Sequence, residues 1–530
     1  MTRAWACLSA IASLLIAAPA SAADWYVDPR SGSPSGDGSM GNPWRTLEEV
    51  VAAGLIETRH YSPLPYSASS TLMPVNAGAP IQPGDTIWLA SGFHGALSIQ
   101  GAHNAMPITI AAMPGATPQL SHVVFSAASE WVLRGVSISP SYATPYVRQT
   151  ALEIEDHGHH GPSHDITVER CDVFAVPDIA SFSAADWNDQ VGNGISVGSD
   201  DCIIRDDTVR NINFGIQASG QRDLIQRNLV ENFAGDGLRG LGDYDVFEHN
   251  TVRNCFAVND NHDDGFQSWS VGPGGVGTGE VVGIVLRGNT IINYTDEAQP
   301  LRGTLQGIGC FDGFFTDWVI ENNVIITDHW HGITLLGARG SRIVNNTVID
   351  PNDERPGPTW ISIDDHKDGS PSTDCVVRNN LSMDIQVPDR PTVTVDHNVL
   401  VDDPARFFVD APGYDLHLLA DAPAIDVGVD TLAPMFDFDG IARPQLGGYD
   451  VGAYEWHEPS VVPADAGMPP IGTDGGPSVG RDGGLSGFRD GGIGGPMDGG
   501  CGCRAAPRSS RTPLALVLGL LAAVLVRRRG

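Results

Sequence analysis

The stretch that decides the fold is Val285-Leu286-Arg287-Gly288-Asn289-Thr290-Ile291, an apolar and polar run built around an asparagine. Similar runs recur along the chain at spacings of 18 to 39 residues, with asparagines at Asn228, Asn250, Asn289, Asn323, Asn346, Asn380 and Asn398. A period of about 20 residues, rich in β-branched side chains and asparagine, fits one coil of a parallel β-helix. We therefore predict an all-β, single-stranded right-handed parallel β-helix, in which the repeat asparagines satisfy turn backbone groups.

A second predicted strand follows each repeat asparagine, as in Gly194-Ile195-Ser196-Val197 and Gly332-Ile333-Thr334-Leu335. Side chains alternate between the two faces of a strand, so the second residue of each run is expected inside and the third outside. The predicted inward residues are Ile216, Leu238, Phe266, Ile308 and Ile333. The predicted outward residues are Ser196, Gln217, Arg239, Gln267, Thr334 and Ser362. Function is expected on this outward face.

Composition limits the partners of the chain. Its 530 residues include 64 acidic and 31 basic side chains, which gives a formal net charge of −33. Nucleic acids and anionic lipids need a basic surface, so neither is an expected partner. The length suits one large domain with tails, and we expect it to be a monomer.

Four segments are predicted. Residues 1–23 read as a secretory signal, because Arg3 precedes an apolar stretch and then small residues around Ala20-Ser21-Ala22. Residues 24–457 form the β-helix domain, which opens with a capping helix near Thr46 and Glu49, a capping-box pair. Residues 458–500 are a disordered linker rich in Pro, Gly and Asp.

Residues 501–530 form the last segment, with Cys501-Gly502-Cys503-Arg504, a short apolar helix from Leu514 to Val526 and an arginine cluster. This segment resembles the C-terminal sorting tail of myxobacterial surface proteins. The resemblance implies processing near the two cysteines and display at the cell envelope. The apolar helix is short for a permanent transmembrane span.

Cysteines cannot form a complete disulfide framework in the predicted domain. Their number is odd and they lie in distant coils, so we expect buried thiols that act as small apolar fillers. These residues are Cys171, Cys202, Cys255, Cys310 and Cys375.

Three aspartates are predicted to meet on adjacent coils. Asp236 lies on one coil, and Asp263 and Asp264 lie on the next. Coils stack about 4.8 Å apart, so three carboxylates can converge and bind a hard cation such as Ca²⁺. Asp-Gly pairs also form plain coil corners, which is the alternative for this motif.

Further polar and aromatic residues surround these aspartates in the sequence. His262, Gln267 and Trp269 flank the aspartate pair, and His331 lies further along the same face. Polar groups beside an aromatic surface suit a sugar, so these four residues are predicted to bind substrate.

This arrangement is similar to the pectate-lyase-like β-helix superfamily, and in particular to a bacterial pectate lyase family with a calcium site of four aspartates. Asp236, Asp263 and Asp264 match three of these, whereas the fourth position is Gln267. The resemblance implies Ca²⁺-assisted β-elimination on an acidic polysaccharide, but the family's catalytic lysine has no counterpart in the nearby coil.

The predicted catalytic residues are therefore Arg239 and Arg302, either of which needs an environment that lowers a very high pKa to act as a base. Lys367, the single lysine of the chain, is chemically easier but lies about three coils beyond Asp264, roughly 14 Å away unless its loop folds back.

Two alternatives stay open. Asp263 and Asp264 with His331-Gly332 resemble elements of polygalacturonases, which would make the chain a glycoside hydrolase, although their Arg-x-Lys element is absent. A non-catalytic adhesin or glycan-binding protein would use the same face, because fold does not determine function.

Overall fold

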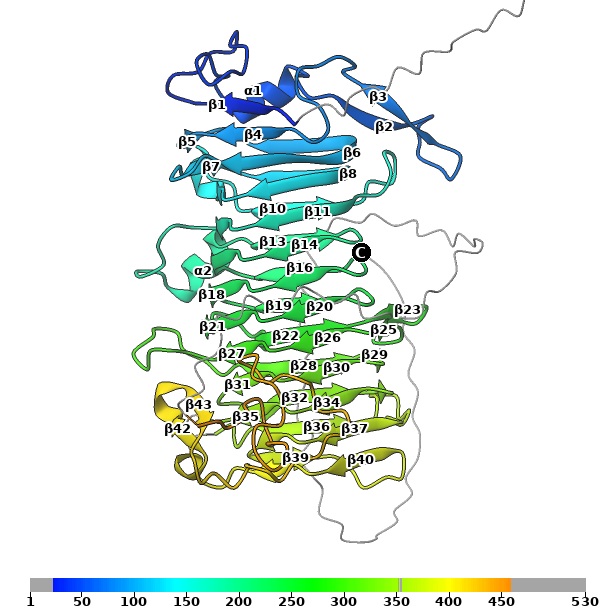
Figure 1. Cartoon of the computed structure of the whole chain (residues 1–530), viewed down its shortest axis with the longest axis vertical. Coiled ribbons are helices and arrows are strands. Elements are labelled where there is room, and N and C mark those ends of the chain that lie inside the picture. Colours follow the sequence, from blue (N-terminus) through cyan, green and yellow to red (C-terminus); the bar gives the residue numbers. More distant parts are fainter. Residues whose placement is uncertain (1–21, 351, 353–354, 459–530) are drawn as a thin grey trace, which may run out of the picture. The chain divides into compact units, whose positions relative to one another are not determined.

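The computed structural model describes residues 22–350, 352 and 355–458, which wind into a stack of coils (Figure 1). Most of the predicted signal segment, nearly all of the linker and the whole C-terminal segment lie outside these residues, so the predicted boundaries stay predictions. Among the residues that the structure describes, no helix is long and apolar enough to cross a membrane.

Strands of successive coils pair in parallel and form three faces, which confirms the parallel β-helix. The first face is built from β6 (Leu97–Ala112), β8 (Val123–Arg134), β10 (Leu152–Glu155), β13 (Ile195–Gly198), β16 (Ile216–Ala218), β19 (Leu238–Gly240), β22 (Asp264–Trp269), β28 (Gln306–Asp312), β32 (His331–Leu336), β36 (Trp360–Asp364) and β39 (Asp384–Gln386). The long strands β6 and β8 continue into the second face.

The second face also contains β1 (Asp24–Val27), β4 (Thr86–Leu89), β11 (His164–Glu169), β14 (Ile203–Arg205), β17 (Leu224–Gln226), β20 (Val246–Glu248), β26 (Val285–Arg287), β30 (Val319–Glu321), β34 (Arg342–Val344), β37 (Cys375–Arg378) and β40 (Val393–Asp396). The third face contains β5 (Gly92–Phe93), β7 (Pro118–Leu120), β9 (Ser137–Ile138), β12 (Asp172–Phe174), β15 (Thr208–Ile212), β18 (Leu229–Phe233), β21 (Thr251–Cys255), β27 (Thr290–Ile292), β31 (Val324–Ile326), β35 (Thr347–Ile349), β38 (Leu381–Ser382) and β41 (Val399–Leu400).

Smaller elements decorate the stack. They are the hairpins β2 (Thr58–Ser62) with β3 (Thr71–Val75), β23 (Val271–Gly272) with β24 (Gly275–Val276) and β42 (Phe408–Asp410) with β43 (Asp415–Leu418), and the parallel set β25 (Glu280–Val282), β29 (Phe314–Thr316) and β33 (Ala338–Arg339). The helices are α1 (Leu47–Ala52), α2 (Ala184–Gln190) and the 3₁₀ turns Pro140–Tyr142, Pro404–Arg406 and Ala411–Gly413. Helix α1 begins after Thr46, whose hydroxyl accepts a hydrogen bond from the Glu49 amide.

The repeat asparagines form a continuous ladder between the second and third faces, which confirms their structural role. Each Nδ2 donates to the Oδ1 of the next asparagine at 2.9 to 3.0 Å, from Asn228 through Asn250, Asn289, Asn323, Asn346 and Asn380 to Asn398. The same Nδ2 also donates to a carbonyl of the preceding coil, as from Asn228 to Ile204. Each amide thus satisfies backbone and side-chain groups in two coils.

Asp207 is the first member of the asparagine ladder, although it is not an asparagine. Its Oδ1 accepts from the Cys171 amide at 2.6 Å, and its own amide donates to Asn228 Oδ1 at 3.0 Å. Its Oδ2 is buried without a hydrogen-bond partner among the described residues. Burial raises the pKa of Asp207 to about 8, so the folded chain favours the protonated acid.

Asp223 and Asp245 are two more buried aspartates that accept hydrogen bonds from backbone amides, in a neighbouring column. The Asp223 carboxylate caps the Cys202 amide, and the Asp245 carboxylate caps the Asp223 amide. Burial raises the pKa of Asp223 to about 9 and that of Asp245 to about 7. All five cysteines of the described region are free and buried, as predicted.

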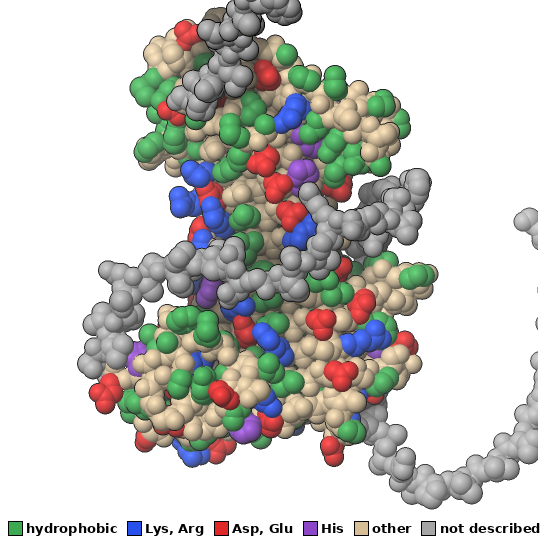
Figure 2. Space-filling model, turned by 45° about the vertical axis from the view of Figure 1, so that its right-hand side comes forward, with side chains coloured by type: hydrophobic (Ala, Val, Ile, Leu, Met, Phe, Trp, Pro, Cys, Tyr) green, Lys and Arg blue, Asp and Glu red, His purple; other side chains and the backbone are tan. Residues whose placement is uncertain are grey.

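A column of opposite charges runs along the second face. Its members stack in strand register as Arg134, Glu169, Arg205, Gln226, Glu248, Arg287 and Glu321. Glu169 bridges two arginines, Arg134 and Arg205, and Arg287 bridges Glu248 and Glu321. On the face displayed in Figure 2, basic side chains likewise lie beside acidic ones over much of the stack. We call the stacked set from Arg134 to Glu321 the charge column.

Candidate functional site

The predicted outward residues lie in one line on the first face. In strand register, this line runs through Glu153, Ser196, Gln217, Arg239, Gln267, Gly309, Thr334, Ser362 and Gln386, and we call it the strip. The residues predicted to point inward are all buried, and each is at most 1% exposed. The period of two therefore predicted the inward side correctly, whereas Thr334 and Ser362 on the outward side are only 2% and 8% exposed.

The Asp236 carboxylate contacts the backbone of Asp264, and Arg239 joins them. Asp236 Oδ1 accepts from the Asp264 amide at 3.2 Å, while its Oδ2 accepts from Arg239 Nε at 2.6 Å. The guanidinium of Arg239 also lies over the ring of Phe214, 3.4 Å from its centroid, and 5.2 Å from the centroid of the Trp269 ring. Arg239 is therefore held as a cation among a carboxylate and two aromatic rings.

His262 and Gln267 hold the carboxylate of Asp264. Its Oδ2 lies 3.0 Å from His262 Nδ1 and accepts from Gln267 Nε2 at 2.8 Å. Its Oδ1 is buried without a hydrogen-bond partner in the described region. Gly309 makes room for this oxygen, since a Cβ at position 309 would lie only 2.1 Å from it.

Burial dominates the electrostatics of the aspartate pair. It raises the pKa of Asp263 to about 8, with a further contribution from the negative charge of Asp236. It also raises the pKa of Asp264 to about 7, against the hydrogen bond from His262, which favours the carboxylate. Neither carboxyl reaches solvent, because Asp263 is 5% exposed and Asp264 is fully buried. His262, which contacts Asp264, and Arg239, which pairs with Asp236, are partly exposed, at 24% and 15%.

The contacts of these aspartates bear on the predicted calcium site. In the described part of the chain, no group of three or more His, Cys, Asp or Glu side chains is placed to hold a metal ion. Arg239 already neutralises Asp236, and His262 and Gln267 share one oxygen of Asp264. The residues present therefore do not offer three open carboxylates to a cation, and calcium binding stays a prediction.

Aromatic side chains cover the strip beyond Gln267. The Phe311 and His331 rings lie edge to face at 4.9 Å, and His331 contacts Trp360 in the same way at 5.3 Å. Trp330 stacks on Trp360 at 6.1 Å. Below them, Thr334 Oγ1 is hydrogen-bonded to His331 Nδ1 and accepts from Trp360 Nε1. The predicted substrate residue His331 is thus part of an aromatic cover over Gly309 and Thr334.

The histidines of this cover are uncharged at neutral pH. Burial, with smaller contributions from His329 and His262, lowers the pKa of His331 to about 3. Burial likewise lowers the pKa of His329, which lies 5.2 Å from His331, to about 4. Sequence reasoning placed His331 near the site but did not identify Phe311 or Trp360 as its partners. Their outward parity in β28 and β36 was the available signal.

Arg302 and Lys367, the other bases suggested by the sequence, contact residues outside the aspartate cluster. Arg302 donates to the Glu297 carbonyl and lies over the Tyr294 ring at 4.4 Å, contacts that hold it in its own loop. Lys367 reaches back to β28, where its Nζ donates to Asp312 Oδ1 at 2.7 Å. The loop therefore does fold back, and it brings the lysine beside the register partner of Trp269.

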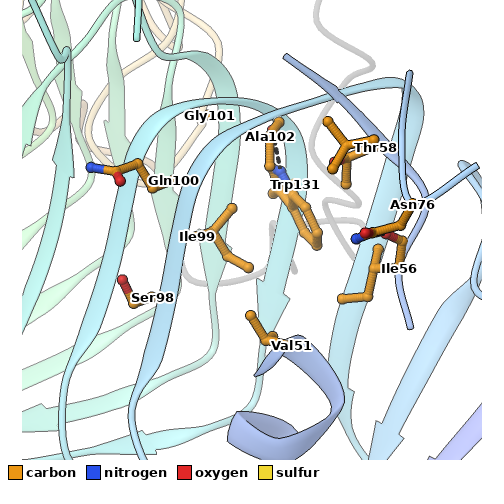
Figure 3. A pocket seen from close by; sticks show the side chains of 11 residues that line it. Val51, Ile56, Thr58, Asn76, Ser98, Ile99, Gln100, Gly101, Ala102 and Trp131 are labelled. Atoms are coloured by element: carbon orange, nitrogen blue, oxygen red, sulfur yellow. Dashed lines mark hydrogen bonds between the residues drawn. The ribbon is translucent and has the colours of Figure 1, made fainter. Parts of the chain in front are cut away.

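A separate pocket of about 280 Å³ lies near the N-terminal end of the stack (Figure 3). It is lined by Val51 of α1, residues of the β2–β3 hairpin region, and β6. Its buried donors are already used, because Trp131 Nε1 donates to the Ala102 carbonyl and Asn76 Nδ2 to the Ile56 carbonyl. This pocket shares no residue with the strip.

Comparison with known families agrees with the geometry. A family model described as "right handed beta helix region" matches residues 193–369. The fold is a right-handed parallel β-helix. No curated protein matches the chain.

Several solved structures are distantly similar to the chain. A pectate lyase, Pel9A, is 13% identical, with 82% of this chain and 96% of that chain covered and a TM-score of 0.40. XylC in complex with xylose is 10% identical, with 82% and 98% covered and a TM-score of 0.44. The A-module of the mannuronan C-5 epimerase AlgE6 from Azotobacter vinelandii is 14% identical, with 60% and 91% covered and a TM-score of 0.39. These likenesses are too distant to bear on the activity of this chain.

Proposed function

We propose that the chain binds a uronate-containing polysaccharide along the strip and cleaves it by β-elimination at His262. One observation carries this proposal: a partly exposed histidine is hydrogen-bonded to a buried aspartate, and both lie one coil from an arginine. A base next to a fixed cation is the pair of groups that elimination from a uronate requires.

In the proposed step, His262 takes the proton from the carbon next to the uronate carboxylate. The electron pair of that bond forms a carbon–carbon double bond, the bond to the departing sugar oxygen breaks, and this oxygen takes a proton from water. In this proposal Arg239 keeps its pair with Asp236 through Nε, and the rest of its guanidinium faces the substrate carboxylate and stabilises the intermediate. Asp264 is a positioning residue that orients the imidazole, as carboxylates do in other histidine-dependent sites. This role for Arg239 differs from the base role expected from sequence.

The burial of Asp263 and Asp264 favours elimination over hydrolysis. A glycoside hydrolase of the usual kind needs two carboxyl groups at the scissile bond, one as acid and one as base or nucleophile. Asp263 and Asp264 are 5% and 0% exposed, so neither reaches a bound sugar. The partly exposed groups are instead an imidazole and a guanidinium.

The test is an assay of the full-length chain on polyuronates and uronate-containing heteroglycans, following the absorbance of unsaturated products. The His262→Ala variant should lose at least about a hundredfold in rate, the usual contribution of a general base. The matched control is His397→Ala, which changes a histidine paired with Asp396 on a distant coil. New reducing ends without the chromophore would indicate a hydrolase, and tight binding without products would indicate an adhesin.

The setting of this activity is also a proposal. We propose that the chain is exported, acts as a monomer and is displayed at the cell envelope through residues 501–530, on the sequence features given above. Cell fractionation with an antibody to the β-helix domain tests this proposal, since removal of residues 501–530 should release the protein into the medium.

A further inference from the structure

Charge along the strip is very unevenly distributed. Of its members, Arg239 alone is basic and Glu153, at the far N-terminal end, alone is acidic. Between Arg239 and Glu153 the strip holds Ser196 and Gln217, and on the other side it continues with uncharged residues as far as Gln386. A glycan lying over several coils therefore meets one basic side chain, Arg239, whose Nε already pairs with Asp236.

The aromatic cover adds no positive charge on the C-terminal side of Arg239. It presents Trp330 and Trp360, with Phe311 buried at 5% exposure beside them, together with two histidines that burial keeps neutral. Aromatic rings beside a polar strip suit the apolar faces of uncharged sugar rings.

Acidic residues border this part of the first face. In strand register, Asp384 lies beside Trp360, and Asp364 lies beside Leu336. The nearby cations are matched within the protein: Arg390 pairs with Asp364 and Asp365, and Lys367 pairs with Asp312. A substrate carboxylate on these coils would find no strip cation, and Asp384 would be an acidic neighbour.

We infer that the preferred ligand is a heteroglycan in which a uronate residue at Arg239 is flanked by uncharged sugars, rather than a homopolyuronate. The inference rests on the proposed function, because it assigns the substrate class of the same strip. A homopolyuronate carries a carboxylate on every sugar, and only one of these would find a cation. Charge mismatch at the remaining positions lowers its affinity and association rate.

The test uses the full-length chain and two sets of oligosaccharides of equal length: oligogalacturonates, and oligomers that alternate galacturonate with a neutral sugar. Affinity is measured by calorimetry, and elimination by the absorbance of unsaturated products. We expect the alternating oligomers to bind at least about tenfold more tightly, as unpaired like charges at a recognition site cost that much or more. Their kcat/KM should be higher by a similar factor.

Two variants sharpen this test. Gln217→Arg places a second cation next to Arg239 on the strip, so it should raise the affinity for oligogalacturonates severalfold. Thr394→Arg is the control, because it adds the same charge on the second face at an exposed position of β40. Any general effect of net charge would appear in both variants.

Binding and cleavage separate the two proposals. Equal or tighter binding of oligogalacturonates, or binding of neither ligand, would overturn the heteroglycan inference. Preferential binding of the alternating oligomers without unsaturated products would support the ligand class and refute elimination. An effect of Gln217→Arg no larger than that of Thr394→Arg would overturn the argument from strip charge.

Discussion

Asp207 occupies a place in the asparagine ladder where an amide would fit better at neutral pH. In Asn228, the Nδ2 group donates to the ladder neighbour and to the Ile204 carbonyl. The corresponding atom of Asp207 is Oδ2, a buried oxygen without a hydrogen-bond partner among the described residues. A carboxylate here would face acceptors, so Asp207→Asn should supply the missing donor.

The gain should depend on pH. The pKa of Asp207 rises from an ordinary 3.8 to about 8 on folding, so the folded chain binds the proton more tightly than the unfolded chain. The contribution of this group to stability is therefore complete below about pH 4 and is lost as the pH rises towards 8. At roughly 1.4 kcal/mol per pKa unit, the loss amounts to roughly 5 kcal/mol at pH 8.

Urea unfolding of the full-length chain at pH 4 and pH 8 measures this difference. Asp207→Asn should stabilise the protein by up to roughly 5 kcal/mol at pH 8 and change it by less than about 1 kcal/mol at pH 4. The exposed Asp421→Asn is the control for the loss of one negative charge. A parent and variant that differ equally at both pH values would refute the reasoning that Asp207 is a buried acid.

Three further outcomes follow from the described contacts. Gly309→Ala places a Cβ against Asp264 Oδ1 and should displace the carboxylate from His262. The elimination rate should then fall at least about tenfold, and an unchanged rate would contradict the positioning role of Asp264. Asn323→Leu removes ladder bonds to both neighbours and should lower the free energy of unfolding in urea by about 3 kcal/mol. Asn398→Leu, at the end of the ladder, should lower it by less, and equal losses would argue against the ladder as a source of stability. Because Arg239 already neutralises Asp236, EGTA should change the elimination rate less than about twofold, and a large loss restored by Ca²⁺ would establish the calcium site instead.

The repeats made the fold and the strip predictable. An asparagine that recurs after a similar strand marks the same point of each coil, and the period of two then assigns Phe266 inward and Gln267 outward. Asp207 was not predicted, because an aspartate breaks the asparagine pattern, although Ile203-Ile204-Arg205-Asp206-Asp207 parallels Leu224-Ile225-Gln226-Arg227-Asn228.

The candidate site was predictable only in part. Stacking predicted that three carboxylates would converge, whereas the contact between Asp236 and Asp264 runs from the Asp264 backbone amide to the Asp236 carboxylate. The sequence did not reveal that Arg239 would turn back onto Asp236, because a side-chain rotamer decides this pairing. The loop that brings Lys367 back to Asp312 is equally invisible, since loops between coils differ in length and path.

The charge column constrains how a protein of this kind can grow or shorten. The asparagine ladder tolerates the loss of any coil, because the amides on either side of the gap are the same and can join. The column does not share this freedom where one charge lies between two charges of the opposite sign: loss of the coil that carries Glu169 would set Arg134 against Arg205. Loss of the coil that carries Arg287 would likewise set Glu248 against Glu321, so deletion of either coil during evolution should be tolerated only together with a charge reversal.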